Sequence, residues 1–167
     1  MRKFLSMAVL LVMAVTAPST FAKDKAPDVS EAYLEGAGAG NNGSANVRVT
    51  IVAKKADKVT DKQLAEAAVN AILFKGYDDS TNTLSGTATR HNPMAGSPTV
   101  KTQHSDFFTP FFANGDYMNY VQFVEHTRRV AKYGKQFKVS VQLTINTALL
   151  RQDLEKQGVI RGLNSGW

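Results

Sequence analysis

An unbroken alternation of apolar and polar side chains runs from residue 137 to residue 145. Successive side chains of a β-strand point to opposite faces, so this pattern predicts a strand with one buried face. Only one register buries every apolar member, because a shift by one residue would bury a lysine. The side chains expected to point inward are Val139, Val141 and Leu143, and those expected to face outward are Lys138, Ser140, Gln142 and Thr144.

A second alternation and a capped helix follow each other earlier in the chain. Residues 46–53 alternate in the same way and predict another half-buried strand. Thr60 followed three residues later by Gln63 has the pattern of a capping box, and apolar residues then repeat at helical spacing up to Gly76. We therefore expect a helix over 61–75, whose alanines would allow it to lie close to a sheet.

The middle of the chain has weaker patterns. In the polar stretch 77–103 only residues 83–89 resemble a strand. A short helix that begins near Ser105 or Asp106 would contain Phe107, Phe108, Phe111 and Phe112 and would place Pro110 in its first turn, where a missing N–H costs little. We interpret these rings as core-filling, and an exposed docking patch is the alternative.

The remaining elements suggest the fold class. Residues 117–124 favour a strand that forms a hairpin with 137–145 through a turn at Gly134, although Tyr117, Val121 and Val124 also fit helical spacing. Asn146 or Thr147 should cap a last helix, with Leu150 and Leu154 on one face and Gly158 at its end. Together these elements predict an α+β domain, a two-layer sandwich in which an antiparallel or mixed sheet of about three to five strands packs against two main helices.

The N-terminal segment has the organisation of a cleavable secretory signal peptide. Arg2 and Lys3 precede an apolar run of about 12 residues, which is shorter than the ~20 that span a membrane, and small residues place cleavage near Ala22. We expect residues 1–22 to be a signal peptide, 23–45 a flexible leader rich in Gly, Ala and Asn, and 46–167 a single domain. The mature chain should be periplasmic or extracellular, without a transmembrane segment.

Cysteine content and charge exclude several classes of function. The chain has no cysteine, which excludes disulfides, thiol catalysis and cysteine-ligated metals. Loss of Arg2 and Lys3 with the signal peptide lowers the formal net charge from +6 to +4. This moderate excess permits an anionic partner in the envelope and is no signature of nucleic-acid binding, so we expect no nucleic-acid partner.

Two further motifs resemble known proteins. The C-terminal run from Gly158 to Trp167, and the doubled phenylalanines before Asn114-Gly115-Asp116-Tyr117, resemble a family of small uncharacterised exported proteins of Bacteroidota-type bacteria. This resemblance spans roughly residues 46–167, including the helix over 61–75. The strand–helix unit is more weakly similar to the envelope domains of flagellar and LPP20-like lipoproteins, but this chain lacks their lipidated cysteine. The resemblance implies an exported protein and transfers no catalytic residue.

The residues 38–43, Gly-Ala-Gly-Asn-Asn-Gly, match the dinucleotide-binding pattern literally. That chemistry needs a strand before the glycines and a helix N-terminus after them, whereas here a strand is expected to follow. We interpret the segment as a linker and expect no cofactor.

His104, Asp106 and His126 form the one set that offers nitrogen and oxygen ligands for a metal. Their spacing matches no helical ligand pair, and no Gly-x-Ser-x-Gly nucleophile motif is present. A metal-dependent or hydrolytic enzyme that uses these three residues is therefore the alternative and not the leading hypothesis.

A group of basic residues lies around the expected turn at Gly134, with Tyr133 and Phe137 between them. Its members are Arg128, Arg129, Lys132, Lys135 and Lys138. A basic and aromatic surface can hold an anionic envelope glycan, while lysines on a hairpin also protect edge strands from aggregation. The leading hypothesis is a non-enzymatic envelope protein that binds a protein partner or assembly, and glycan binding through this hairpin is the second alternative.

Overall fold

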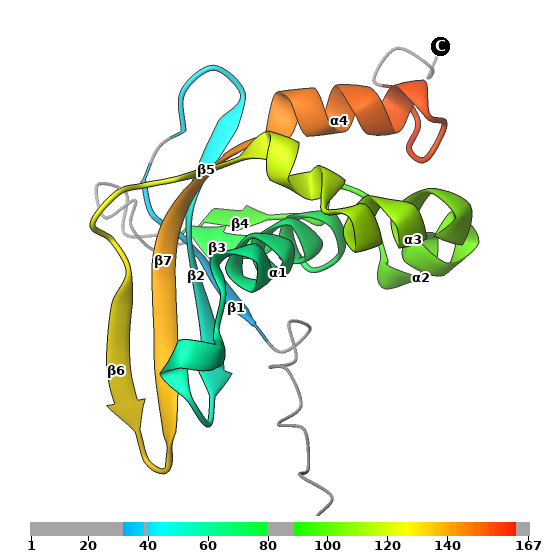
Figure 1. Cartoon of the computed structure of the whole chain (residues 1–167). Coiled ribbons are helices and arrows are strands. Elements are labelled where there is room, and N and C mark those ends of the chain that lie inside the picture. The colour runs from blue at the N-terminus through cyan, green and yellow to red at the C-terminus, as the bar shows by residue number, and fades with distance from the viewer. Residues whose placement is uncertain (1–31, 39, 80–88, 163–167) are drawn as a thin grey trace, which may run out of the picture.

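The computed structural model of the chain describes residues 32–38, 40–79 and 89–162. The predicted signal peptide and the leader up to residue 31 lie outside these ranges. Within them the chain has the predicted α+β class (Figure 1). Its elements are β1 (Tyr33–Gly36), β2 (Ser44–Ala53), η2 (Ala56–Lys58), α1 (Asp61–Phe74), β3 (Tyr77–Asp79), β4 (Thr89–His91), α2 (Pro98–Gln103), α3 (Ser105–Asn114), η3 (Asp116–Tyr120), β5 (Val121–Phe123), β6 (Arg129–Tyr133), β7 (Gln136–Asn146) and α4 (Thr147–Lys156), where η denotes a 3-10 helix.

The strands form one mixed sheet that is wider than predicted. The seven described strands follow the order β4-β3-β1-β2-β7-β5, with β6 also paired to β7, so the expected three to five strands were too few. The pair β1 and β3 is parallel and the other pairs are antiparallel. The strands for which no prediction was made are β1, β3 and β6. They have five residues or fewer, which is too short for a periodic pattern to reveal them.

The two predicted long strands form the centre of the sheet. β2 and β7 pair along their whole length, from Ser44 opposite Asn146 to Ala53 opposite Phe137. The predicted register is confirmed, because the inward side chains of β7 are buried and Lys138 is exposed. The polar residues between them are half-buried. The inward side chains of the two strands are Val47, Val49, Ile51, Ala53, Val139, Val141, Leu143 and Ile145.

Both predicted capped helices are confirmed. The Thr60 side chain accepts the Gln63 N–H, and the Gln63 side chain accepts the Thr60 N–H, which completes the capping box of α1. Helix α1 packs on β2 and β7 and is buried along most of its length, because η3 covers part of its other side. In α4, the Asn146 side chain accepts the Leu149 N–H, and Leu150 and Leu154 are buried. No helix of the described residues is long and apolar enough to cross a membrane.

The aromatic helix α3 fills the core, as interpreted from the sequence. Phe108 and Phe111 are buried, and the Phe108 ring meets the Phe74 ring of α1 edge to face with centroids 5.0 Å apart. The predicted position of Pro110 in the first turn is wrong. Because α3 begins at Ser105, Pro110 is its sixth residue and removes the donor that the Asp106 carbonyl would have accepted.

Part of the expected leader belongs to the sheet. Residues 33–36 form β1, although their composition placed them in a flexible segment, and β2 begins at Ser44 rather than Asn46. β1 lies between β2 and β3, so both of its edges are hydrogen-bonded, and its Leu34 is buried. The weak strand expected over 83–89 falls outside the described residues except for Thr89, which begins β4.

The strand expected over 117–124 is short and starts late. Residues 116–120 form η3, because the Tyr117 ring is fully buried against Phe111 and Phe112 and its hydroxyl donates to the Lys62 carbonyl at 3.2 Å. Only Val121–Phe123 is extended, as β5. The hairpin partner of β7 across the Gly134 turn is β6, so β5 and β6 share one edge of β7.

Candidate functional site

The hairpin formed by β6 and β7 extends beyond the helices (Figure 1). Tyr133 lies opposite Gln136, so the turn consists of Gly134 and Lys135, and Gly134 has a φ of 59°. A positive φ favours glycine at this position of a two-residue hairpin turn. All five residues of β6 are exposed, and Val130 and Tyr133 keep 53% and 54% of their surface accessible. Strand β6 is therefore exposed on both of its faces.

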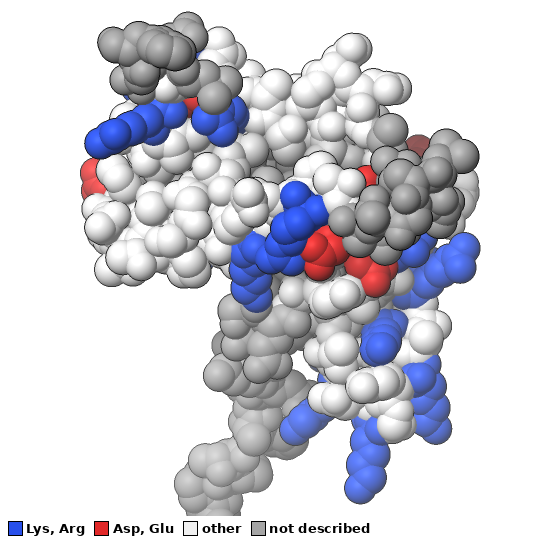
Figure 2. All heavy atoms as spheres, turned by 180° about the vertical axis from the view of Figure 1, so that it is seen from behind, with Lys and Arg blue, Asp and Glu red and all other residues white. Residues whose placement is uncertain are grey.

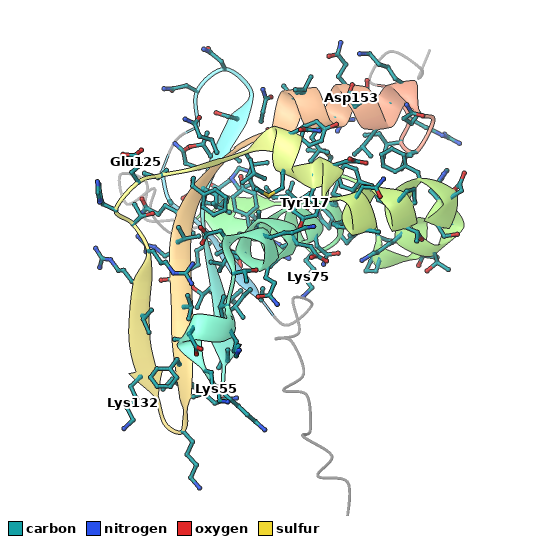
Figure 3. The ribbon with its side chains drawn as sticks, viewed as in Figure 1. Lys55, Lys75, Tyr117, Glu125, Lys132 and Asp153 are labelled. Carbon is teal, nitrogen blue, oxygen red and sulfur yellow. The ribbon has the colours of Figure 1, made fainter. Side chains whose placement is uncertain are left out.

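Cations from two segments meet at this end of the sheet. We define the basic tip as Arg129, Lys132, Lys135 and Lys138 of the hairpin together with Lys54, Lys55 and Lys58 of the turn that follows β2. The second group lies there because Ala53 of β2 pairs with Phe137 of β7. Figure 3 places Lys55 and Lys132 at the same end of the molecule, and Figure 2 shows Lys and Arg side chains around it. Asp57 is the acidic residue of the second segment, so the tip is strongly positive.

Lys138 and Tyr133 form the best-defined contact of the basic tip. The Lys138 ammonium lies 4.2 Å from the centre of the Tyr133 ring. The attraction between a cation and the face of an aromatic ring orders both side chains. No ion pair involves Arg129, Lys132 or Lys135 within the part of the chain that the structure describes. Their charges are thus available to an incoming anion.

Arg128, which the sequence grouped with the hairpin cations, is engaged in contacts with another part of the chain. One of its terminal nitrogens lies 2.6 Å from Oδ1 of Asp61, and the other donates to the Val59 carbonyl at 2.6 Å. These contacts direct the guanidinium toward the start of α1. Sequence proximity grouped it with the hairpin cations, whereas its partner lies 67 residues away in the chain.

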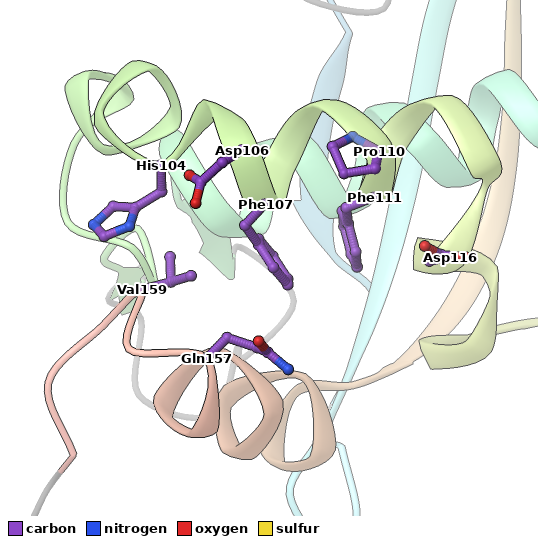
Figure 4. Close-up of a pocket in the computed structure, with 8 residues that line it drawn as sticks. All are labelled: His104, Asp106, Phe107, Pro110, Phe111, Asp116, Gln157 and Val159. Atoms are coloured by element: carbon purple, nitrogen blue, oxygen red, sulfur yellow. The ribbon is translucent and has the colours of Figure 1, made fainter.

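A cavity of about 280 Å³ lies between α3, η3 and the end of α4 (Figure 4). It is lined by His104, Asp106, Phe107, Pro110, Phe111, Asp116, Gln157 and Val159. The carboxylates among these residues, Asp106 and Asp116, form no ion pair with another described residue. Close to the cavity, the Tyr120 hydroxyl donates to Asp153 at 2.9 Å, and burial together with this hydrogen bond raises the pKa of Tyr120 to about 12.

The three residues of the enzymatic alternative do not converge. His104 and Asp106 line the cavity, whereas His126 lies in the loop between β5 and β6, which Figure 1 places on the opposite side of the molecule. Among the described residues no group of three or more His, Asp or Glu side chains is arranged to hold a metal ion. His126 has a φ of 59° and takes part in a tight loop.

The loop over 124–128 bridges the interval between β5 and β6 on the edge of β7. The Thr127 hydroxyl accepts the Gln142 N–H at 3.0 Å and donates to the Val124 carbonyl at 2.7 Å, while the Val124 N–H donates to the Gln142 carbonyl. The Thr127 hydroxyl thus takes the place of a main-chain carbonyl as the acceptor for the Gln142 N–H, just before β6 begins.

The glycine-rich segment 38–43 joins two antiparallel strands. The strand that follows it, β2, was predicted. The strand that precedes it, β1, was not. A strand therefore stands where a phosphate-binding loop requires a helix N-terminus. Comparisons with family models, with curated proteins and with solved structures found no match for the chain.

Proposed function

We propose that the protein is a non-enzymatic, exported envelope protein that acts by binding, and that its basic tip engages an anionic region of a protein partner or assembly. The observation that carries this proposal is the hairpin itself, which projects from the domain with four cations and exposed side chains along the whole of β6. Charge concentrated on a projecting element steers and holds an oppositely charged partner.

Two other features support the proposal. The helices are inferred to form a second layer over one face of the sheet, which leaves the hairpin beyond their cover. His126 lies apart from His104 and Asp106, so the three residues of the enzymatic alternative do not share one site. Export rests on the pattern of residues 1–22 and on the resemblance to small exported proteins of Bacteroidota-type bacteria.

The proposal is tested with two matched double variants. Lys132→Gln/Lys135→Gln removes two charges from the basic tip, whereas Lys156→Gln/Arg161→Gln removes two charges from the region of α4. The probes are immobilised poly-glutamate and immobilised heparin, an acidic polypeptide and an anionic glycan, and the measurement is the salt concentration that elutes each protein. We expect the tip variant to elute at clearly lower salt and the control to elute near the wild type.

Equal elution of the two double variants would show that net charge alone causes retention, and the proposed surface would then be wrong. Retention on heparin alone that depends on the tip would identify the glycan alternative as the function of the hairpin.

A further inference from the structure

Strand β6 has a main-chain edge without a neighbour among the described strands. It pairs with β7 on one side, and no other strand in the described ranges lies along its second edge. The directions in which the N–H and carbonyl groups of β6 point can be derived from those of β7. The N–H and carbonyl of Gln142 point toward β5 and β6, since they contact Thr127 and Val124, and backbone directions alternate along a strand. Gln136, Lys138 and Ser140 therefore point to β6 as well.

The residues of β6 opposite these three direct their own backbone groups to β7. They are Tyr133, Ala131 and Arg129. The N–H and carbonyl groups of Val130 and Lys132 consequently point away from the sheet. They are the groups that an added strand would pair with.

The charge of the edge selects the occupant. A second copy of this chain paired along β6 would bring a second set of the same cations to this edge, and like charges on neighbouring strands are destabilising. A strand that carries carboxylates next to these cations is attracted to them instead. Val130, with 53% of its surface accessible, offers an apolar contact on the face opposite to that of Arg129.

We propose, resting on the function proposed above, that an extended acidic segment of a partner protein adds to β6 as a further strand of the sheet. The main-chain groups of Val130 and Lys132 supply the pairing. Strand side chains alternate between the two faces, so Arg129 and Val130 point to opposite faces of β6. A segment in which carboxylates alternate with apolar residues can therefore meet Arg129 on one face and Val130 on the other. Lys132 and Lys135 add positive charge toward the end of the hairpin. A glycan has no strand backbone to pair, so it would use the charges alone.

The deciding variant is Val130→Pro. Proline removes an N–H that points away from the sheet, which edge strands tolerate, and it leaves every charge of the basic tip in place. Val130→Ala is the matched control, because it shortens the same side chain and keeps the N–H. The probes are a short alternating Glu-Val peptide and heparin, and the measurement is the affinity of each for wild type and variants, with the melting temperature as a check on folding.

We expect Val130→Pro to weaken peptide binding by about tenfold or more, as loss of a hydrogen bond and of the strand geometry implies, and to leave heparin binding unchanged. Hydrogen exchange on the wild type gives a second measurement that needs no variant. The amides of Val130 and Lys132 should become protected when the peptide binds, while heparin should leave them exposed.

Strand addition is overturned if Val130→Pro folds and binds the peptide as tightly as Val130→Ala, or if these two amides stay unprotected in the bound state. If Lys132→Gln/Lys135→Gln still weakens both probes in that case, the function proposed for the basic tip stands without the added strand. If the double variant changes neither probe, both proposals fail.

Discussion

The guanidinium of Arg128 lies 2.6 Å from the carboxylate of Asp61 and ties the start of β6 to the start of α1. The same side chain donates to the Val59 carbonyl, so it spans the residues on both sides of the helix cap. Asp61 is also in the first turn of α1, where a negative charge is favoured by the helix dipole. One arginine of the basic segment is therefore structural, while its neighbours face solvent.

This difference between Arg128 and the exposed cations predicts that one substitution affects stability and another affects binding. Arg128→Gln should lower the free energy of unfolding by about 1 kcal/mol, because the partly exposed ion pair and one charge-assisted hydrogen bond are lost. Lys132→Gln should leave stability within about 0.5 kcal/mol of the wild type, as expected for an exposed side chain without such contacts. Urea unfolding measures both. Poly-glutamate retention should respond in the reverse order, and equal retention by the two variants would contradict the assignment.

The hydrogen bond from Tyr120 to Asp153 predicts a loss of stability in alkali. The pKa of Tyr120 is raised to about 12, whereas an unfolded tyrosine ionises near pH 10. A raised folded-state pKa stabilises the fold fully below about pH 10, and the contribution is lost as the pH rises toward 12. Tyr120→Phe should be less stable at neutral pH and should lose less stability than the wild type over that alkaline range. Parallel stability curves for both proteins would disprove the link.

The separation of His126 from His104 and Asp106 predicts indifference to zinc. Excess zinc or a chelator should leave the melting temperature unchanged, because the described residues contain no group of three or more such ligands. His104→Ala serves as the control, since any weak effect at the cavity should disappear with it. Stabilisation well beyond ~2 kcal/mol at excess zinc would restore the metal hypothesis.

Elements with a local signal could be predicted from the sequence. β2 and β7 have long alternations, and α1 and α4 have capping residues within three positions of their start. β1, β3 and β4 have four residues or fewer, and their order depends on partners far away in the chain, as when Glu35 pairs with Asp78. Such strands leave no periodic pattern, because their stability comes from pairing with other strands.

The candidate site divides in the same way. The hairpin cations are neighbours in sequence and were found there, whereas Lys54, Lys55 and Lys58 join them only through the pairing of β2 with β7. The free edge of β6 also depends on tertiary structure, because β5 and β6 share one side of β7. No sequence pattern distinguishes an edge strand of five exposed residues from a loop.

Export predicts a shortened mature chain. The basic start, the apolar run and the small residues before position 23 predict cleavage after Ala22. Mass spectrometry of the secreted or periplasmic protein should find an N-terminus at or near Lys23. A membrane-free mature protein that keeps Met1 would contradict this prediction, and Ala22→Arg should block cleavage if the site is correct.

The register of β7 predicts that two adjacent substitutions have very different effects. Val141 keeps 4% of its surface accessible and packs in the core, whereas Gln142 is half-buried on the other face. Val141→Asp should lower the free energy of unfolding by several kcal/mol, because apolar burial is lost and an unpaired charge is enclosed. Gln142→Asp should be tolerated within about 1 kcal/mol, since its backbone N–H still reaches Thr127. Denaturant unfolding compares the two, and equal stability would mean that β7 does not have this register.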